Sequence, residues 1–166
     1  KPGDSVRLGN VLVTMDKGVR ADLAQLTVRS DNSALQRVLQ LVDGSLATQT
    51  LQIDQGLLDQ AGGSVRAGSL AVGGDSPGDA AYRLGGGTLQ TASVTVGAPG
   101  GAEAMMFQAG GEHRSRNLLV TSRGGLGRYV LDAGTLTVTE TTRVGGANVA
   151  GLAGSRFDHS GGKFIT

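Results

Sequence analysis

The side chains that could do chemistry in this chain are few. Its 166 residues include no Cys, two His and 14 Asp or Glu. The lack of Cys excludes a disulfide scaffold, a thiolate zinc site and a cysteine nucleophile. What remains is acid–base chemistry by carboxylates with a basic partner, which requires that such groups lie close together.

A repeated unit in the sequence would have to position these groups. It occurs in two alternating versions, and such self-similarity is typical of stacked repeat architectures. The first version reads YRLGGGTL at 82–89 and YVLDAGTL at 129–136. The second reads MFQAGG at 106–111 and FDHSGG at 157–162.

The last glycine of each copy defines a common position zero. Apolar residues stand at −5 in every copy, and alternating apolar residues near +2, +7 and +9 predict two further short strands. Glycine at position zero supplies a positive φ at a corner between strands. The predicted corner glycines are Gly44, Gly63, Gly87, Gly111, Gly134 and Gly162.

Three short strands and three bends per copy predict an all-β fold, a single-stranded parallel β-helix (solenoid). We expect about seven coils of roughly 19–28 residues, wound right-handed, with successive coils ~4.8 Å apart. The composition agrees, because 29 Gly and only five aromatic residues suit a narrow tube. We predict that residues 1–166 form one segment of a longer repeat protein, with degenerate coils over 1–38 and regular coils over 39–166.

An active site on such a solenoid needs carboxylates on one outward face of neighbouring coils. Glu140 is the single acidic residue at positions +3 to +6, which we predict to face outward. Asp59 and Asp158 share position −4 but lie four coils apart, roughly 19 Å at the spacing between strands. We therefore predict no enzyme activity, no catalytic residue, no cofactor and no metal site.

Two further features resemble catalytic or metal-binding patterns. The segment 160–163, SGGK, matches a Ser-x-x-Lys motif but falls on a predicted corner rather than on a helix. His113 and His159 occupy different repeat positions, +2 and −3, which argues against a shared metal site. We expect His159 to be a hydrogen-bonded inward residue.

Polar and aromatic residues at the inward positions predict an interior with a few hydrogen bonds. Gln60 and Gln108 stand at −3, where other copies carry Leu. They lie two coils apart, so we expect each to bond the local backbone at the Gly-Gly corner rather than to form a ladder. Tyr82 and Tyr129 share position −5, and we expect them to pack in the interior.

Basic residues gather in one stretch of the sequence. His113, Arg114, Arg116, Arg123 and Arg128 are predicted to lie on the surface, and the default interpretation is an ordinary solvated face. The alternative is a binding patch for an anionic glycan or a neighbouring subunit, with Arg66 and Arg143 as further candidate members. The formal net charge of +1 argues against a nucleic-acid partner. No apolar run is long enough to insert in a membrane.

The repeat also resembles a known kind of protein. Tyr-x-Leu-x-x-Gly-Thr-Leu, alternating with Phe/Met-x-Gln-x-Gly-Gly and followed by Val-x-Val-Gly, is similar to the repeats of large secreted bacterial surface proteins. These include autotransporter passengers with autotransporter-associated β-strand repeats and long repeat proteins with sorting anchors. The resemblance covers residues 39–166 and implies export and exposure at the bacterial cell surface.

Two functions follow as hypotheses. The first is a non-enzymatic structural rod or stalk segment of an exported bacterial surface or extracellular fibre. Its partners would be flanking coils of the same longer chain or end-to-end copies of itself. The alternative is an adhesin-type module that binds glycans or a host surface through corner loops and the arginine-rich face. We disfavour a polysaccharide-active β-helix enzyme because its carboxylates would be too far apart.

Overall fold

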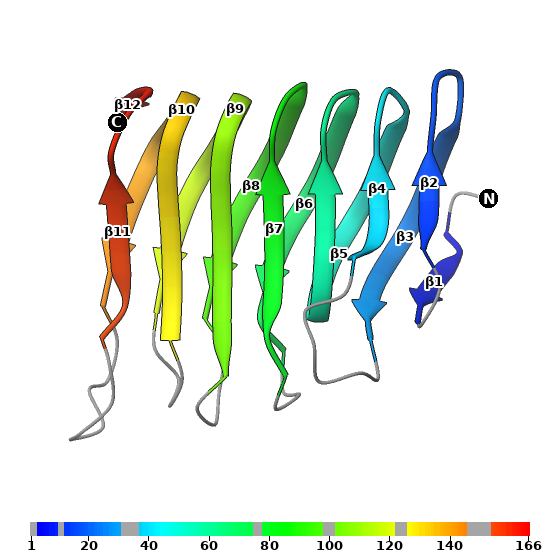
Figure 1. Ribbon diagram of the computed structural model, residues 1–166, viewed down its shortest axis with the longest axis horizontal. Coiled ribbons are helices and arrows are strands. Elements are labelled where there is room, and N and C mark those ends of the chain that lie inside the picture. The colour runs from blue at the N-terminus through cyan, green and yellow to red at the C-terminus, as the bar shows by residue number, and fades with distance from the viewer. Residues whose placement is uncertain are drawn as a thin grey trace.

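The protein is a β-solenoid of about six turns in a computed structural model (Figure 1). The structure describes residues 3–9, 12–30, 37–74, 78–97, 102–121, 126–145 and 154–166. The described residues contain strands and no helix, so no helix among them could span a bilayer. Figure 1 shows the coils following one another along the long axis, from the N-terminus at one end to the C-terminus at the other.

Each coil contributes short strands that pair with the coils before and after it. Every described strand pair is parallel, as the fold prediction requires. The strands are β1 (Ser5–Leu8), β2 (Val13–Met15), β3 (Arg20–Arg29), β4 (Arg37–Leu41), β5 (Ser45–Gln60), β6 (Ser64–Val72), β7 (Ala80–Leu84), β8 (Thr88–Val96), β9 (Glu103–Val120), β10 (Leu126–Val144), β11 (Arg156–His159) and β12 (Lys163–Ile165).

Equivalent residues of successive coils stack directly on one another. At position −5 the paired residues are Val13, Leu39, Leu58, Tyr82, Met106, Tyr129 and Phe157. Seven stacked positions bound six full turns, which reconciles the predicted coils with the observed turns. At position −3, Leu84 and Leu131 both pair with Gln108, so they share one face as predicted.

The core is a column of aliphatic side chains inside the tube. Leu51, Leu70, Val94 and Leu118 stack at position +7, and each is almost completely buried. Outward residues alternate with them along each strand, which is the period-two pattern that predicted these strands. Burial of these aliphatic columns in every coil is the main driving force for the fold.

The glycine corner is confirmed in five of its six predicted members. Gly63, Gly87, Gly111, Gly134 and Gly162 have φ between 65° and 84°. The corner is also crowded, because a Cβ on Gly134 would lie 2.3 Å from the carbonyl oxygen of Gly111. Both effects exclude larger residues.

Gly44 corrects the corner prediction. It occupies the same register position as Gly63, since Ser45 pairs with Ser64, but its φ is not positive. A Cβ on Gly44 would meet the Val19 carbonyl oxygen at 3.0 Å. The preceding coil has Val19 as an extra residue after Gly18, whose φ is 82°. The irregular coil below therefore relieves Gly44 of the backbone conformation that the regular corners require.

Candidate functional site

The carboxylates that the sequence offers for catalysis do not converge. Asp59 lies four pairing steps from Asp158, through Arg83, Phe107 and Val130. Asp59 is buried and lies 3.8 Å from the Arg83 guanidinium. Glu140 occupies position +6 of the repeat, whereas Asp59 and Asp158 occupy position −4. It accepts a hydrogen bond from Asn117 Nδ2 at 3.0 Å.

Asp158 is held by two arginines. Arg128 Nε lies 2.7 Å from Asp158 Oδ2, and Arg156 bonds the other carboxylate oxygen. Desolvation alone would raise the pKa of Asp158, but the hydrogen bonds from Arg128 and Arg156 outweigh it and hold the pKa below its usual value. A carboxylate held ionised in this way serves as an ion-pair partner rather than as a proton donor.

Two buried glutamine–tyrosine pairs lie in the interior, as the inward positions of Gln60 and Tyr82 predicted. Gln60 Nε2 donates to the Thr88 carbonyl at 3.0 Å and to the Gly63 carbonyl at 3.4 Å, and Tyr82 donates its hydroxyl proton to Gln60 Oε1. We call this arrangement the Gln60 unit. The Gln60 amide thus bonds carbonyls at the corners of two successive coils, and the predicted bond to the local corner is confirmed.

The Gln108 unit repeats this arrangement two coils further on. Gln108 Nε2 donates to the Thr135 carbonyl at 3.0 Å and to the Gly111 carbonyl at 3.4 Å, and Tyr129 donates to Gln108 Oε1 at 2.7 Å. The Tyr129 ring also stacks on Phe157, with ring centroids 5.3 Å apart. The pKa of Tyr129 lies well above its usual value because the phenol is buried, with the Tyr82 charge adding to the effect.

His113 was wrongly predicted to belong to a surface patch, because it is completely buried. It occupies position +2, which Leu89 and Leu136 fill in the neighbouring coils. Its Nδ1 lies 2.9 Å from the Tyr129 hydroxyl, and its Nε2 lies 3.3 Å from Thr91 Oγ1. The apolar residues at +2 in the other coils were the sequence signal for this inward orientation.

The hydrogen-bond network fixes the tautomer of His113. Tyr129 uses its only hydroxyl proton to donate a hydrogen bond to Gln108. The Tyr129 oxygen must therefore accept a hydrogen bond from the N–H at His113 Nδ1. Nε2 of the neutral ring is then the acceptor for Thr91. Burial lowers the pKa of His113 to about 3, so the ring is neutral at physiological pH.

The predicted arginine patch does not assemble on one surface. Arg114 and Arg116 are exposed on β9 at positions +3 and +5. Arg128 lies on the first part of β10, where it pairs with Met105 and bonds Asp158, so it faces another side of the tube. Arg123 lies outside the described residues. Sequence proximity grouped these residues, but Arg128 stacks on Met105, which precedes the Gly111 corner, whereas Arg114 follows that corner.

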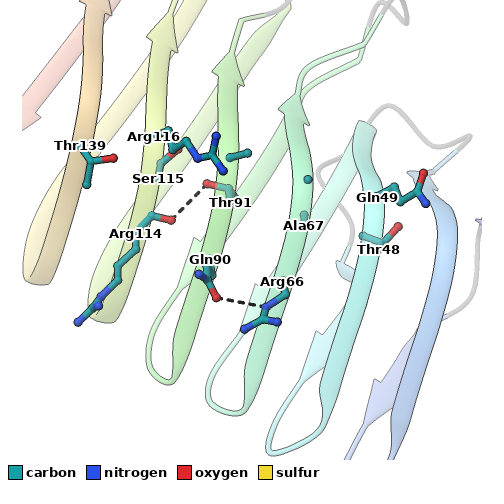
Figure 2. A pocket seen from close by; sticks show the side chains of 12 residues that line it. Thr48, Gln49, Arg66, Ala67, Gln90, Thr91, Arg114, Ser115, Arg116 and Thr139 are labelled. Atoms are coloured by element: carbon teal, nitrogen blue, oxygen red, sulfur yellow. Dashed lines mark hydrogen bonds between the residues drawn. The ribbon is translucent and has the colours of Figure 1, made fainter.

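A groove lies along the face that carries Arg114 and Arg116 (Figure 2). It has a volume of about 620 Å³ and extends across β5, β6, β8, β9 and β10. Residues at +3 form one wall, with Arg66, Gln90 and Arg114 in lateral register. Figure 2 shows Arg66 bonded to Gln90, with Nε 3.2 Å from Oε1.

The floor of the groove corrects the prediction that positions +3 to +6 all face outward. Thr48, Ala67, Thr91 and Ser115 at +4 are buried. Two of their hydroxyl groups donate to the carbonyl two residues later, as Ser115 does to Asn117 at 2.9 Å, and so stabilise the bend. Small side chains at the bend leave the hollow open.

Gly68 is required at this bend by a close backbone approach. A Cβ there would lie 2.7 Å from the Gln49 carbonyl oxygen. Ala92 occupies the next equivalent position, and neither residue pairs laterally, since the register passes from Ala67–Thr91 to Ser69–Ser93. Sequence analysis missed the groove because the repeat pattern gives the period of the bend and not its curvature.

The C-terminal SGGK segment forms a corner, as predicted. Ser160 donates to Asp132 Oδ1 at 3.0 Å, and Gly162 has a φ of 75°. His159 is in register with Leu131 at −3 and lies 3.4 Å from the Gly162 carbonyl oxygen, but its side chain is exposed. No group of side chains suited to hold a metal ion occurs within the described ranges.

Comparisons with protein-family models, with curated proteins and with solved structures found no match to this chain. The solenoid, its interior and the groove are therefore the features that bear on function.

Proposed function

We propose that this chain is a structural rod segment of an exported bacterial surface or extracellular fibre protein, without catalytic activity. The observation that supports the rod is the unbroken register, in which seven stacked residues from Val13 to Phe157 keep one position across six turns. The proposal of export to a bacterial surface rests on the resemblance of the repeats.

The architecture suits a load along the axis. Hydrogen bonds between parallel strands run across the strands and therefore along the solenoid axis. To extend the rod by one coil, a pulling force must break all the bonds between that coil and its neighbour together. The aliphatic column opposes the same separation, because each opened gap exposes apolar surface to water.

The proposed partners are further coils of the same chain or end-to-end copies of it. At the N-terminal end, an apolar hollow of about 270 Å³ is lined by side chains that include Val6, Leu8, Val13 and Leu23. At the other end, Phe157 and Phe164 are only partly buried. Exposed strand edges and apolar surface of this kind favour association with a matching edge.

Single-molecule pulling tests the mechanical role. Because the chain has no Cys, a cysteine added at each terminus gives two unique attachment points. We expect stepwise rupture in increments of one coil, and a lower rupture force in Leu131→Ala, which removes buried contacts. Thr139→Ser, at an exposed position, is the control. Smooth extension without force steps would refute the rod.

Protease treatment of intact cells that produce the parent protein tests exposure at the surface. If the protein is exposed, protease added outside the cells should remove it.

The alternative function, a glycan-binding module, is favoured by one specific observation. The groove is lined by three arginines and runs along several coils. This binding function is compatible with a rod, because the groove lies on the side of the tube and leaves both ends free to stack.

A further inference from the structure

The groove presents positive charge on both walls. Its lining contains Arg66, Arg114 and Arg116, and none of the residues that line it is acidic. Arg114 is partly neutralised by Glu112, at 2.8 Å. In the part of the chain that the structure describes, no carboxylate is within ion-pair distance of Arg66 or Arg116. These two guanidinium groups are therefore available to an anionic ligand.

The two guanidinium groups lie on opposite sides of the recess and at different heights along the axis. Arg66 is on β6 at position +3, and Arg116 is on β9 at position +5, two coils further. Two coil steps correspond to about 10 Å. In Figure 2 the Arg116 side chain extends toward β8, whereas Arg114 points away from that strand. A ligand that reaches both Arg66 and Arg116 must lie along the groove.

The remaining lining is polar and small. Gln49, Gln90 and Thr139 offer amide and hydroxyl groups at the walls, and Ala92 leaves room between them. No aromatic side chain lines the groove, so it provides no platform for stacking nucleic-acid bases. Hydroxyl and amide groups beside arginines suit a ligand that carries many hydroxyls and widely spaced anionic groups.

We propose that this groove binds a linear acidic polysaccharide, whose carboxylate or sulfate groups pair with Arg66 and Arg116 and whose hydroxyls bond the neighbouring amide and hydroxyl side chains. Arg suits both anions because its planar guanidinium donates two parallel hydrogen bonds to either. The repeat along the axis lets one extended ligand contact several coils at once. The proposal rests on the alternative function, glycan binding, and is independent of the mechanical role, so it would survive failure of the rod.

Titration of the whole chain with defined oligosaccharides tests this site. The probes are a heparin oligosaccharide for sulfate, an oligogalacturonate for carboxylate, and neutral dextran. We expect binding of at least one acidic probe that weakens as salt is added, and no binding of dextran. The difference between the two acidic probes identifies the anion. If neither binds, or if dextran binds as well, the proposal is wrong.

Matched variants locate the binding in the groove. We expect Arg66→Gln and Arg116→Gln each to weaken binding about tenfold, the loss typical of one charge-assisted pair. Ala92→Glu should weaken it at least as much, because it fills the recess and repels anions. Arg143→Gln removes the same charge from an exposed position outside the groove, and we expect a change of less than about twofold.

Two outcomes would overturn the assignment. Equal losses in Arg143→Gln and Arg116→Gln would mean that binding depends on overall charge and not on the groove. Equally tight binding of a single-stranded oligonucleotide of matched charge would mean that the site does not distinguish a sugar chain from another polyanion. Thermal unfolding of each variant controls for the fold, and all of these substitutions lie at positions that are not fully buried.

Discussion

The Gln60 and Gln108 units share the same glutamine–tyrosine hydrogen-bonding pattern and differ in the residue at position +2. In both, the amide nitrogen of a glutamine donates to carbonyls at two successive corners, and its oxygen accepts a hydrogen bond from a tyrosine of the next coil. The residue at +2 in the glutamine's own coil is Val65 in the first unit and His113 in the second. The Tyr82 hydroxyl bonds Gln60, whereas the Tyr129 hydroxyl bonds both Gln108 and His113.

This difference shows how a narrow apolar tube accommodates an ionisable ring. His113 is tolerated because Thr91 and Tyr129 satisfy its two ring nitrogens, so neither ring nitrogen lacks a hydrogen bond. As a consequence, the stability of the fold depends on the protonation state of His113, because burial lowers the pKa of the ring and keeps it neutral. We therefore expect the two units to respond alike to damage at their shared corner and differently to loss of the tyrosine hydroxyl or to acid.

The largest effect is expected at the corner glycines, which both units share. Gly63→Ala and Gly111→Ala each place a Cβ on a residue whose φ is near 65°. In both, this Cβ lies within 2.7 Å of the carbonyl oxygen of the corner glycine in the preceding coil. Backbone strain and overpacking together should cost about 3–5 kcal/mol of unfolding free energy at either site. Urea unfolding measures this. Gly44→Ala, where φ is not positive, should cost about 1 kcal/mol, and equal costs at all three would contradict the corner assignment.

Removal of the tyrosine hydroxyls should separate the two units. Tyr82→Phe leaves Gln60 Oε1 without the Tyr82 donor, which should cost about 1–2 kcal/mol of unfolding free energy. Tyr129→Phe removes both the donor to Gln108 and the acceptor for His113, so we expect about 3 kcal/mol. Urea unfolding of the two variants under the same conditions measures the difference.

A double variant identifies the source of this difference. When His113→Val is present, the Gln108 unit has the same members as the Gln60 unit. The cost of Tyr129→Phe should then fall to that of Tyr82→Phe. If the two tyrosine substitutions cost the same in the unaltered chain, the His113–Tyr129 hydrogen bond makes no net contribution.

The features that follow from the repeat period could be predicted from the sequence, whereas those that depend on how the backbone bends within a coil could not. The stacking of Leu84 with Leu131 and the inward glutamines followed from residues that recur at one position. The burial of His113 could also have been inferred, because position +2 is apolar elsewhere. The groove could not be inferred, because its shape depends on a backbone bend at Gly68 and on small residues there. The separation of Arg128 from Arg114 arises because Arg128 lies on the strand segment that leads into the stacked glycine corners and Arg114 on the segment that follows them.

Acid should destabilise the protein through the Gln108 unit. The pKa of His113 is about 3 in the folded chain, against the ordinary value of 6.5 that the exposed ring has after unfolding. As the pH falls below 6.5, the unfolded chain takes up a proton that the folded chain does not, so stability is lost by about 1.4 kcal/mol per pH unit until the pH approaches 3. Between about pH 7 and pH 5 we expect a loss of about 2 kcal/mol.

Chemical denaturation at a series of pH values measures this loss. His113→Val removes the ionisable ring and should abolish most of the pH dependence in that range, whereas Val65→Leu should leave it unchanged. The low pKa of Asp158 adds a further loss only at more acidic pH, because its usual value is already 3.8. A His113→Val protein with unchanged pH dependence would assign the acid sensitivity to other groups.

The smallest expected effect tests whether the histidine environment can be transferred to the first unit. Thr48 and Tyr82 stand relative to Val65 as Thr91 and Tyr129 stand relative to His113. Val65→His should therefore find a hydroxyl on each side of the introduced ring. The Thr48 hydroxyl now donates to the Thr50 carbonyl at 2.9 Å and must turn to donate to the ring. That change, with some overpacking, should cost about 1 kcal/mol near neutral pH.

The pH dependence is the decisive measurement for Val65→His. If the network alone makes a buried histidine tolerable, the loss of stability between about pH 7 and pH 5 should double to about 4 kcal/mol, since two rings would then resist protonation. Val65→Leu controls for the added volume. A variant that loses several kcal/mol at neutral pH, without added acid sensitivity, would show that bonding partners are insufficient. The Gln108 unit would then owe its histidine to packing features that the Gln60 unit lacks, such as the stacking of Tyr129 on Phe157.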